Sequence, residues 1–441
     1  MVWRMDAPVP ALEPVLPRRA RRRRLLLLLA LGLPVLAIAA FALSRAGDPP
    51  VPERPARLAV IDLDGGLSTL DEDGRSIAHH DIPGVTFQFP AWSPDGSRVA
   101  AIGRDGRSAG IYVLAGDGTS GDRPAPIYTS DFNPPFYLSW SPDGTRVSFL
   151  TTEPGGIALR VAPADASGPA WIVRRGSPFY WDWVDPGRLL VHVGSTGPDA
   201  FVGEVDLEGR ALVAPAAEPG GFFRAPVVSR PSGHRAWIQP DVGDGQAIVL
   251  EPRDGSSRRE IPVEGNVAVG FHPTAATLAF IATDRPVDVP PPFPIGPLRV
   301  VDAGAGDVRT LVDGLVMAFF WSPDGRTIAA LEFLGPGATD VEQAAVRAVQ
   351  PPGVAVRLRF VDVATGATRS ERSVRVTDLF AFQVLPFFDQ YALSHRVWSP
   401  HSAAIVLPIA SDGRPDRLVV LPVDGADPRH LADGAVAFWS P

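Results

Sequence analysis

The phrase Trp92-Ser-Pro-Asp-Gly96 stands again, unchanged, at Trp140–Gly144 and at Trp321–Gly325. Each copy ends one apolar stretch and precedes another. Within the phrase, proline fixes φ for a turn, aspartate bonds to the neighbouring backbone, and glycine tolerates positive φ. The phrase therefore predicts a tight corner between two strands, repeated along the chain.

Degenerate copies extend this pattern over the body of the chain. Each keeps part of the phrase in place, and they stand at Trp183–Gly187, Ser229–Gly233, Phe271–Ala275, Trp398–Ser402 and Trp439–Pro441. The copies follow one another at a period of about 45 residues, which is typical of a repeat array. The interval between Trp321 and Trp398 is longer and holds an insertion.

Short apolar strands are expected on both sides of each corner. One follows the corner directly, as at Arg98–Ile102, and another comes after a loop, as at Ile111–Leu114. A further strand then leads to the next tryptophan. Four short antiparallel strands per period, with no helix between them, predict an all-β fold made of propeller blades. The tryptophan is expected to pack between adjacent blades, where such a ring buries about 150–250 Å².

These residues resemble the TolB-like, WD40-like propeller repeat, whose hallmark is the same Trp-Ser-Pro-Asp-Gly phrase followed by two apolar strands. The resemblance covers about residues 57–441. It implies the fold and says little about activity, because such propellers serve many roles.

The two ends of the body predict how the ring closes. Leu58–Asp62 matches a second strand, whereas Phe438–Pro441 matches the start of a blade. We therefore expect a β-propeller of seven or eight four-stranded blades. Eight blades, one of them a composite of both chain ends, are favoured over seven with a stray edge strand.

A basic and apolar segment precedes the body. Residues 1–24 carry seven Arg and two acidic residues, and Leu25–Leu43 has no charge. A helix of that length can cross a hydrocarbon layer about 30 Å thick, and flanking Arg residues stay cytoplasmic. We expect a basic cytoplasmic tip (1–24), a transmembrane signal-anchor helix (25–43), a Pro-rich stalk (44–56) and a propeller (57–441) outside the cytoplasm. A signal peptide cleaved near Ala40–Ala42 is the main alternative, and a buried soluble helix is the least favoured one.

Composition excludes several chemistries. The net charge is −8 although the N-terminal tip is basic, so the body is acidic and a nucleic-acid partner is not expected. Cysteine is absent, which excludes disulfides and thiolate metal sites. All basic residues are Arg, which excludes Schiff-base lysine chemistry.

Four short stretches point to chemistry only weakly. Gly106–Gly110 matches G-x-S-x-G, but it lies between two expected strands and not before a helix. His79–Asp81 alternates its side chains between the two faces of a strand. Asp62–Gly66 and Asp71–Gly74 fit blade turns better than a calcium loop. We predict no catalytic residue, no metal ligand and no cofactor.

The insertion holds the candidate binding residues. Aromatic rings, a carboxylate and an imidazole gather there, outside the repeat pattern, at Phe387, Asp389, Gln390, Tyr391 and His395. Exposed aromatic residues beside polar groups are good binding anchors. The alternative is that these rings extend the core of a blade.

The favoured function is a non-enzymatic, membrane-anchored propeller outside the cytoplasm that binds a protein or a cell-envelope glycan. One alternative is an exported hydrolase or lyase that acts on an envelope or extracellular saccharide at the mouth of the ring. Another is a sensor that signals through the short cytoplasmic tip. Convergent carboxylates and His at one mouth would favour the enzyme.

Overall fold

The computed structural model describes residues 55–119, 124–194, 200–212, 225–240, 245–283, 294–334, 353–411 and 414–441. The predicted cytoplasmic tip, the membrane-spanning segment and the stalk up to residue 54 lie outside this range. None of the helices in the described part of the chain is long and apolar enough to cross a membrane.

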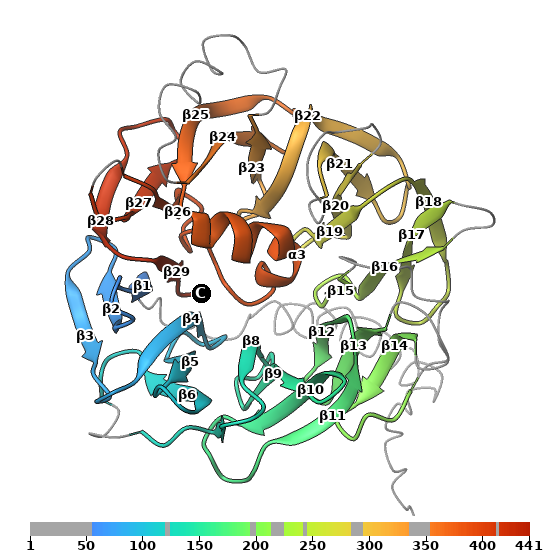
Figure 1. The fold of residues 1–441 in the computed structure, drawn as a ribbon. Helices are drawn as coiled ribbons and strands as arrows, with labels where there is room; N and C mark the ends of the chain where they lie inside the picture. The colour runs from blue at the N-terminus through green and yellow to red at the C-terminus, as the bar shows by residue number, and fades with distance from the viewer. Residues whose placement is uncertain are drawn as a thin grey trace, which may run out of the picture. The chain divides into compact units, whose positions relative to one another are not determined.

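Antiparallel sheets follow one another around a ring in residues 55–441 (Figure 1). The first sheet consists of β29 (Val436–Trp439), β1 (Arg57–Ile61), β2 (Leu67–Asp71) and β3 (Ser76–His80). The next two run in chain order and contain β4 (Thr86–Trp92), β5 (Arg98–Arg104), β6 (Ala109–Ala115) and β7 (Tyr128–Ser130), then β8 (Pro135–Trp140), β9 (Arg146–Glu153), β10 (Gly156–Pro163) and β11 (Trp171–Gly176).

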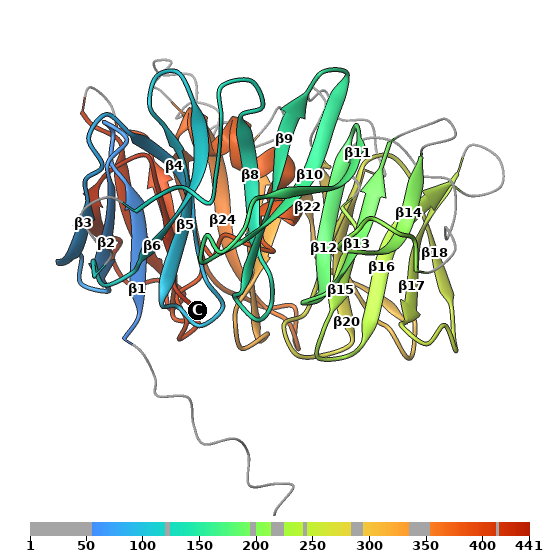
Figure 2. The same cartoon turned by 90° about the horizontal axis from the view of Figure 1, so that it is seen from below.

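The following sheets continue in the same direction. Three described strands form one sheet, β12 (Phe179–Asp185), β13 (Arg188–Val193) and β14 (Phe201–Asp206). Four form the next, β15 (Val227–Ser229), β16 (His234–Pro240), β17 (Gln246–Pro252) and β18 (Arg259–Val263). The sheets stand side by side when the ring is seen edge-on (Figure 2).

The last ten strands are hydrogen-bonded into one series. They are β19 (Val267–Phe271), β20 (Thr277–Ala282), β21 (Gly296–Asp302), β22 (Val308–Trp321), β23 (Thr327–Phe333), β24 (Val354–Asp362), β25 (Thr368–Val376), β26 (Ala404–Ile409), β27 (Arg417–Pro422) and β28 (Arg429–Asp433). The series is continuous because β22 pairs with β21 near its start and with β23 near its end. Between β25 and β26 a single pair, Val376 with Ile409, joins the strands.

The two ends of the described chain meet in one sheet, as the sequence predicts. Strand β1 pairs antiparallel with β29, so that Leu58 lies opposite Trp439 and Ile61 opposite Val436. The start of β1 therefore lies beside the end of β29, where the last copy of the phrase begins.

The phrase forms the predicted corner in each intact copy. The hydroxyls of Ser93, Ser141 and Ser322 each donate to the aspartate two residues later, at 2.6 Å. The three phrase glycines have φ between 66° and 70°. A side chain with a Cβ is strained at such an angle, which explains the glycine.

Four of the phrase tryptophans join neighbouring repeats of the ring. The indole nitrogens of Trp92, Trp140, Trp321 and Trp398 donate to the backbone oxygens of Phe438, Ala91, Gly270 and Phe320, at 2.9 to 3.1 Å. Each acceptor immediately precedes the phrase of the previous repeat around the ring. The predicted packing of these rings between blades is thus confirmed, with a hydrogen bond that the pattern alone did not indicate.

Candidate functional site: the central cavity

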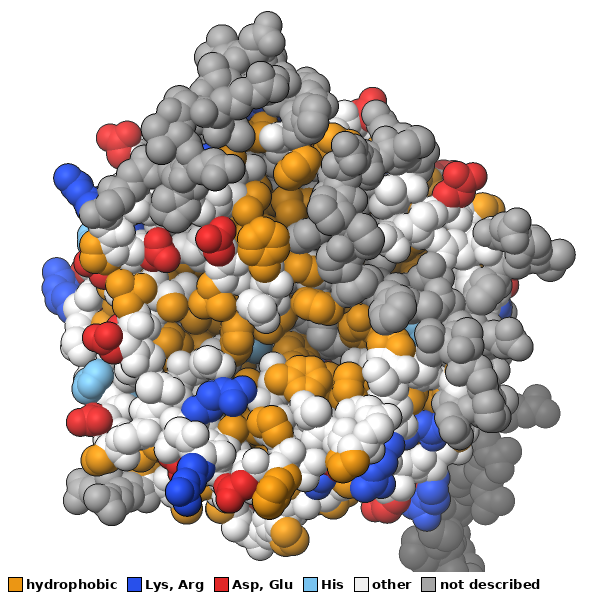
Figure 3. All heavy atoms as spheres, in the orientation of Figure 1, with side chains coloured by type: hydrophobic (Ala, Val, Ile, Leu, Met, Phe, Trp, Pro, Cys, Tyr) orange, Lys and Arg blue, Asp and Glu red, His pale blue; other side chains and the backbone are white. Residues whose placement is uncertain are grey.

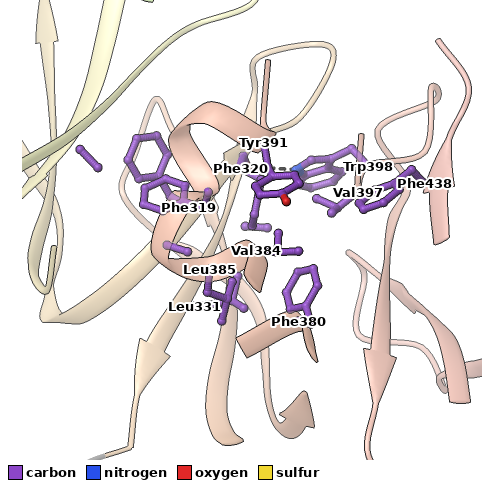
Figure 4. Close-up of a cluster of buried hydrophobic side chains, with 14 of the residues drawn as sticks. Phe319, Phe320, Leu331, Phe380, Val384, Leu385, Tyr391, Val397, Trp398 and Phe438 are labelled. Atoms are coloured by element: carbon purple, nitrogen blue, oxygen red, sulfur yellow. Dashed lines mark hydrogen bonds between the residues drawn. The ribbon is translucent and has the colours of Figure 1, made fainter. Parts of the chain in front are cut away.

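The insertion between β25 and β26 lies at the centre of the ring (Figure 1). It contains a π-helical turn (Phe380–Val384), a 3₁₀ turn (Leu385–Phe387) and the short helix α3 (Phe388–Tyr391). Its apolar side chains pack with residues of the inner strands (Figure 4), and Phe380, Leu385 and Phe388 are at most 1% exposed. Burial of this apolar face holds the insertion inside the ring.

Polar bonds fix the insertion to three other sheets. The Tyr137 hydroxyl on β8 donates to the Gln390 backbone oxygen at 2.6 Å. The Gln390 side-chain amide donates to the Trp181 backbone oxygen on β12 at 2.8 Å. The His395 Nε2 lies 3.2 Å from the Phe89 backbone oxygen on β4. Because a carbonyl only accepts, Nε2 carries the proton, and Nδ1 accepts from the Ser394 hydroxyl at 2.6 Å.

The structure brings the predicted binding residues together but buries them. Asp389, Gln390, Tyr391 and His395 are 1% to 7% exposed, and Phe387 is half-buried. The ring centroids of Tyr391 and His395 are 5.1 Å apart. The expectation of exposed aromatic anchors is therefore corrected. An apolar insertion at the centre of a ring is surrounded by inner strands, so Phe380, Phe388 and Tyr391 become core, whereas Phe382 is 57% exposed.

A cavity of about 410 Å³ lies between the insertion and the corner phrases. The insertion contributes Phe388, Asp389, Ala392 and His395, and the phrases contribute Pro273, Pro323, Pro400 and Pro441. Between them the inner strands supply mostly aromatic walls, formed by Phe271, Phe319, Phe320, Trp321 and Trp398. Its volume falls in the usual range for small-ligand sites.

Burial displaces the pKa values of Asp389 and His395, two of the titratable groups that the insertion contributes to the cavity. Desolvation raises the pKa of Asp389 to about 7, against backbone N–H bonds from Gln390 and Ala225 that favour the carboxylate. Desolvation lowers the pKa of His395 to about 4, so its imidazole is neutral at pH 7. Strongly displaced pKa values in a cavity mark a candidate functional site.

Sequence reasoning missed the cation of this cavity. Arg396 lines it and is exposed to solvent. Desolvation and the positive charge of Arg230 nevertheless lower its pKa. A guanidinium that water reaches, but that protein atoms surround on most sides, is both exposed and lowered in pKa. One signal was present in the sequence, because the other phrase tryptophans carry an uncharged residue two positions earlier, as Phe319 does before Trp321.

No family model matches the chain, and no curated protein matches it in sequence. Solved structures do. The C-terminal WD40 domain of Sif2 has a TM-score of 0.51 at 12% identity, over 84% of this chain and 93% of that one. The dihydro-heme d1 dehydrogenase NirN, in complex with DHE, has a TM-score of 0.50 at 14% identity, over 89% and 76%. The fold is a β-propeller.

The predicted resemblance to TolB-like, WD40-like propellers is confirmed at the level of the fold. A putative TolB from Agrobacterium tumefaciens gives a lower TM-score of 0.36 at 20% identity, over 62% of this chain and 95% of that one. At these identities the propeller neighbours establish architecture alone.

Proposed function

We propose that this propeller is a membrane-tethered binding module outside the cytoplasm, and that its central cavity receives a group of its partner from the corner-phrase end. The observation that carries the proposal is the asymmetry of the ring centre. The chain fills one part of the centre with its own insertion and leaves a cavity beside the phrases. The partner is a protein or an envelope glycan.

The attachment point supports a partner near the membrane. Arg57 begins β1 beside Trp439, and its guanidinium donates to the Gly96 backbone oxygen at 2.6 Å. The chain thus enters the propeller at the phrase end. The predicted anchor would therefore join the propeller at the end where the corner phrases lie, which favours a partner near the membrane.

We also propose eight blades. The ten-stranded series divides into three blades if β22 serves two of them and if β26 begins a new one. Trp398 forms an isolated bridge with Ile405 and would supply the inner edge of that last blade. The other five sheets, including the composite of β29 and β1, make up the rest.

A binding role is favoured over the alternative of a saccharide hydrolase or lyase. Most glycoside hydrolases use two carboxyl groups that flank the scissile bond. Among the described residues that line the cavity, Asp389 has the single acidic side chain, and it is 7% exposed.

Site-specific photocrosslinking tests the proposal. A photoreactive residue at Ala392, which is exposed and lines the cavity, is introduced into the full-length protein in its own membranes. We expect an adduct that mass spectrometry identifies as one partner. The matched control is Ile77, which is 40% exposed on β3 and does not line the cavity. Equal labelling from both positions, or none from Ala392, would contradict the proposal.

A further inference from the structure

We infer that the cavity binds a carboxylate attached to an apolar body, with the Arg396 guanidinium paired to the carboxylate and the aromatic walls around the apolar part. This inference rests on the proposed function and specifies the group that enters the cavity. Three features of the site carry it: an unpaired cation, the engagement of the neighbouring polar groups, and the nature of the walls.

The first feature is the cation. Arg396 is exposed, lines the cavity and makes no side-chain hydrogen bond or ion pair within the described part of the chain. Its backbone oxygen accepts from the Trp439 amide, which holds the residue in place. An arginine offers a planar fork of N–H donors that matches a carboxylate in a bidentate pair.

The second feature is that nearby groups already have partners and leave this charge uncompensated. Arg230, whose charge acts on Arg396, is itself bonded to the Asp182 carboxylate at 3.3 Å and to the Trp183 backbone oxygen at 2.5 Å. Asp389 accepts backbone N–H groups, at 2.9 Å from Gln390. His395 is bonded through both ring nitrogens and is uncharged at pH 7. An incoming anion would therefore supply the missing counter-charge.

The third feature is the wall. The indole N–H groups of Trp321 and Trp398 already donate to backbone oxygens, so their rings offer only apolar surface. Phe271, Phe319 and Phe320 extend that surface. A strongly hydrated dianion such as phosphate gains little from these walls, because a single guanidinium replaces few of its water contacts. A monoanionic carboxylate on an apolar body uses both parts of the site.

The test compares a charged probe with its neutral isostere. The full-length protein in lipid nanodiscs is titrated with 3-phenylpropionate and with 3-phenylpropionamide, followed by ligand-detected NMR, with empty nanodiscs as background. We expect the acid to bind about ten-fold more tightly than the amide, the range of a charge-assisted hydrogen bond. Arg396→Gln should abolish this preference and leave amide binding unchanged. Arg107→Gln, in an exposed loop, is the matched control and should keep the preference.

Two further arms locate the site and the source of the carboxylate. Ala392→Trp places an indole in the cavity and should weaken both probes. N-acetylphenylalanine represents the end of a peptide chain, and 3-phenylpropionate a free acid; binding of either one supports the inference.

Equal binding of acid and amide to the native protein overturns the inference, as does an acid preference that survives Arg396→Gln. Failure of all the carboxylates to bind also overturns it. The proposal of a binding module is tested separately, by the crosslink from Ala392, because that experiment does not depend on the charge of the ligand.

Discussion

The corner phrases and the central insertion are both rich in aromatic residues, but different contacts hold them in place. Trp140 donates to Ala91 of the previous sheet at 2.9 Å, and Trp398 repeats the same bond to Phe320. The insertion has no such repeated partner. Its Gln390 and His395 reach Trp181 and Phe89, which lie in two different sheets.

The difference teaches how each region is specified. A phrase contact forms between one corner and the next copy of the same corner. The same sequence pattern therefore specifies this contact at each repeat that carries it. An insertion contact depends on a single match between residues far apart in the chain. We therefore expect phrase variants to weaken the whole ring, and insertion variants to loosen the centre first.

The largest effect is expected from Trp140→Ala. The ring is 7% exposed, and the Arg98 guanidinium lies 5.0 Å from its centroid. Loss of a buried tryptophan should lower the free energy of unfolding by about 3–5 kcal/mol, measured by chemical denaturation. Trp140→Phe keeps a ring and removes the bond to Ala91, so about 1 kcal/mol is expected. Equal losses for the two variants would show that the hydrogen bond and not the packing dominates.

A smaller effect is expected from Gln390→Ala. The change leaves the Trp181 backbone oxygen, deep in the ring, without the amide donor at 2.8 Å. Such an orphaned group costs about 1–3 kcal/mol. Hydrogen exchange should accelerate in residues 380–395 before it does in β9 (Arg146–Glu153). Uniform acceleration in both regions would break the comparison between phrase and insertion.

The pH dependence of the insertion is expected to be small in the native protein because two groups oppose each other. The pKa of Asp389 is raised to about 7, so its contribution to stability is lost as pH rises from about 4 to 7. The pKa of His395 is lowered to about 4, so its contribution is lost as pH falls from about 6.5 to 4. Each slope is at most about 1.4 kcal/mol per pH unit.

Single variants should separate these two slopes. Asp389→Asn leaves the His395 slope, so unfolding free energy should rise between pH 4 and 6.5. His395→Gln leaves the Asp389 slope, and the free energy should fall over the same range. Denaturation at several pH values checks both signs, and flat profiles in both variants would contradict the assignment.

The smallest effect is expected from Ser108→Ala in the G-x-S-x-G match. The hydroxyl lies in an exposed loop and donates to Asp105 at 2.9 Å. Loss of such a surface bond should change stability by about 0.5 kcal/mol or less. Hydrolysis of a p-nitrophenyl ester should be equal in both proteins; a loss of hydrolysis in the variant would restore the nucleophile hypothesis.

The sequence by itself determined the propeller, the corner and the packing of the tryptophans. These follow from residues close together in the chain and from their period: proline and glycine set the corner at Pro94 and Gly96, and repetition places one sheet against the next. It also determined that Leu58 and Trp439 belong to one sheet, because each end carries the part of a blade that the other lacks.

Only the tertiary structure decided the ring centre. Whether the rings near Tyr391 are exposed or buried depends on where the insertion folds, and that depends on distant partners such as Tyr137 and Phe89. The same holds for Arg396, whose significance arises from the cavity around it. A charged side chain on an open surface stays hydrated, whereas one that protein surrounds loses water contacts and its pKa shifts. This desolvation depends on the fold and not on the neighbours in sequence.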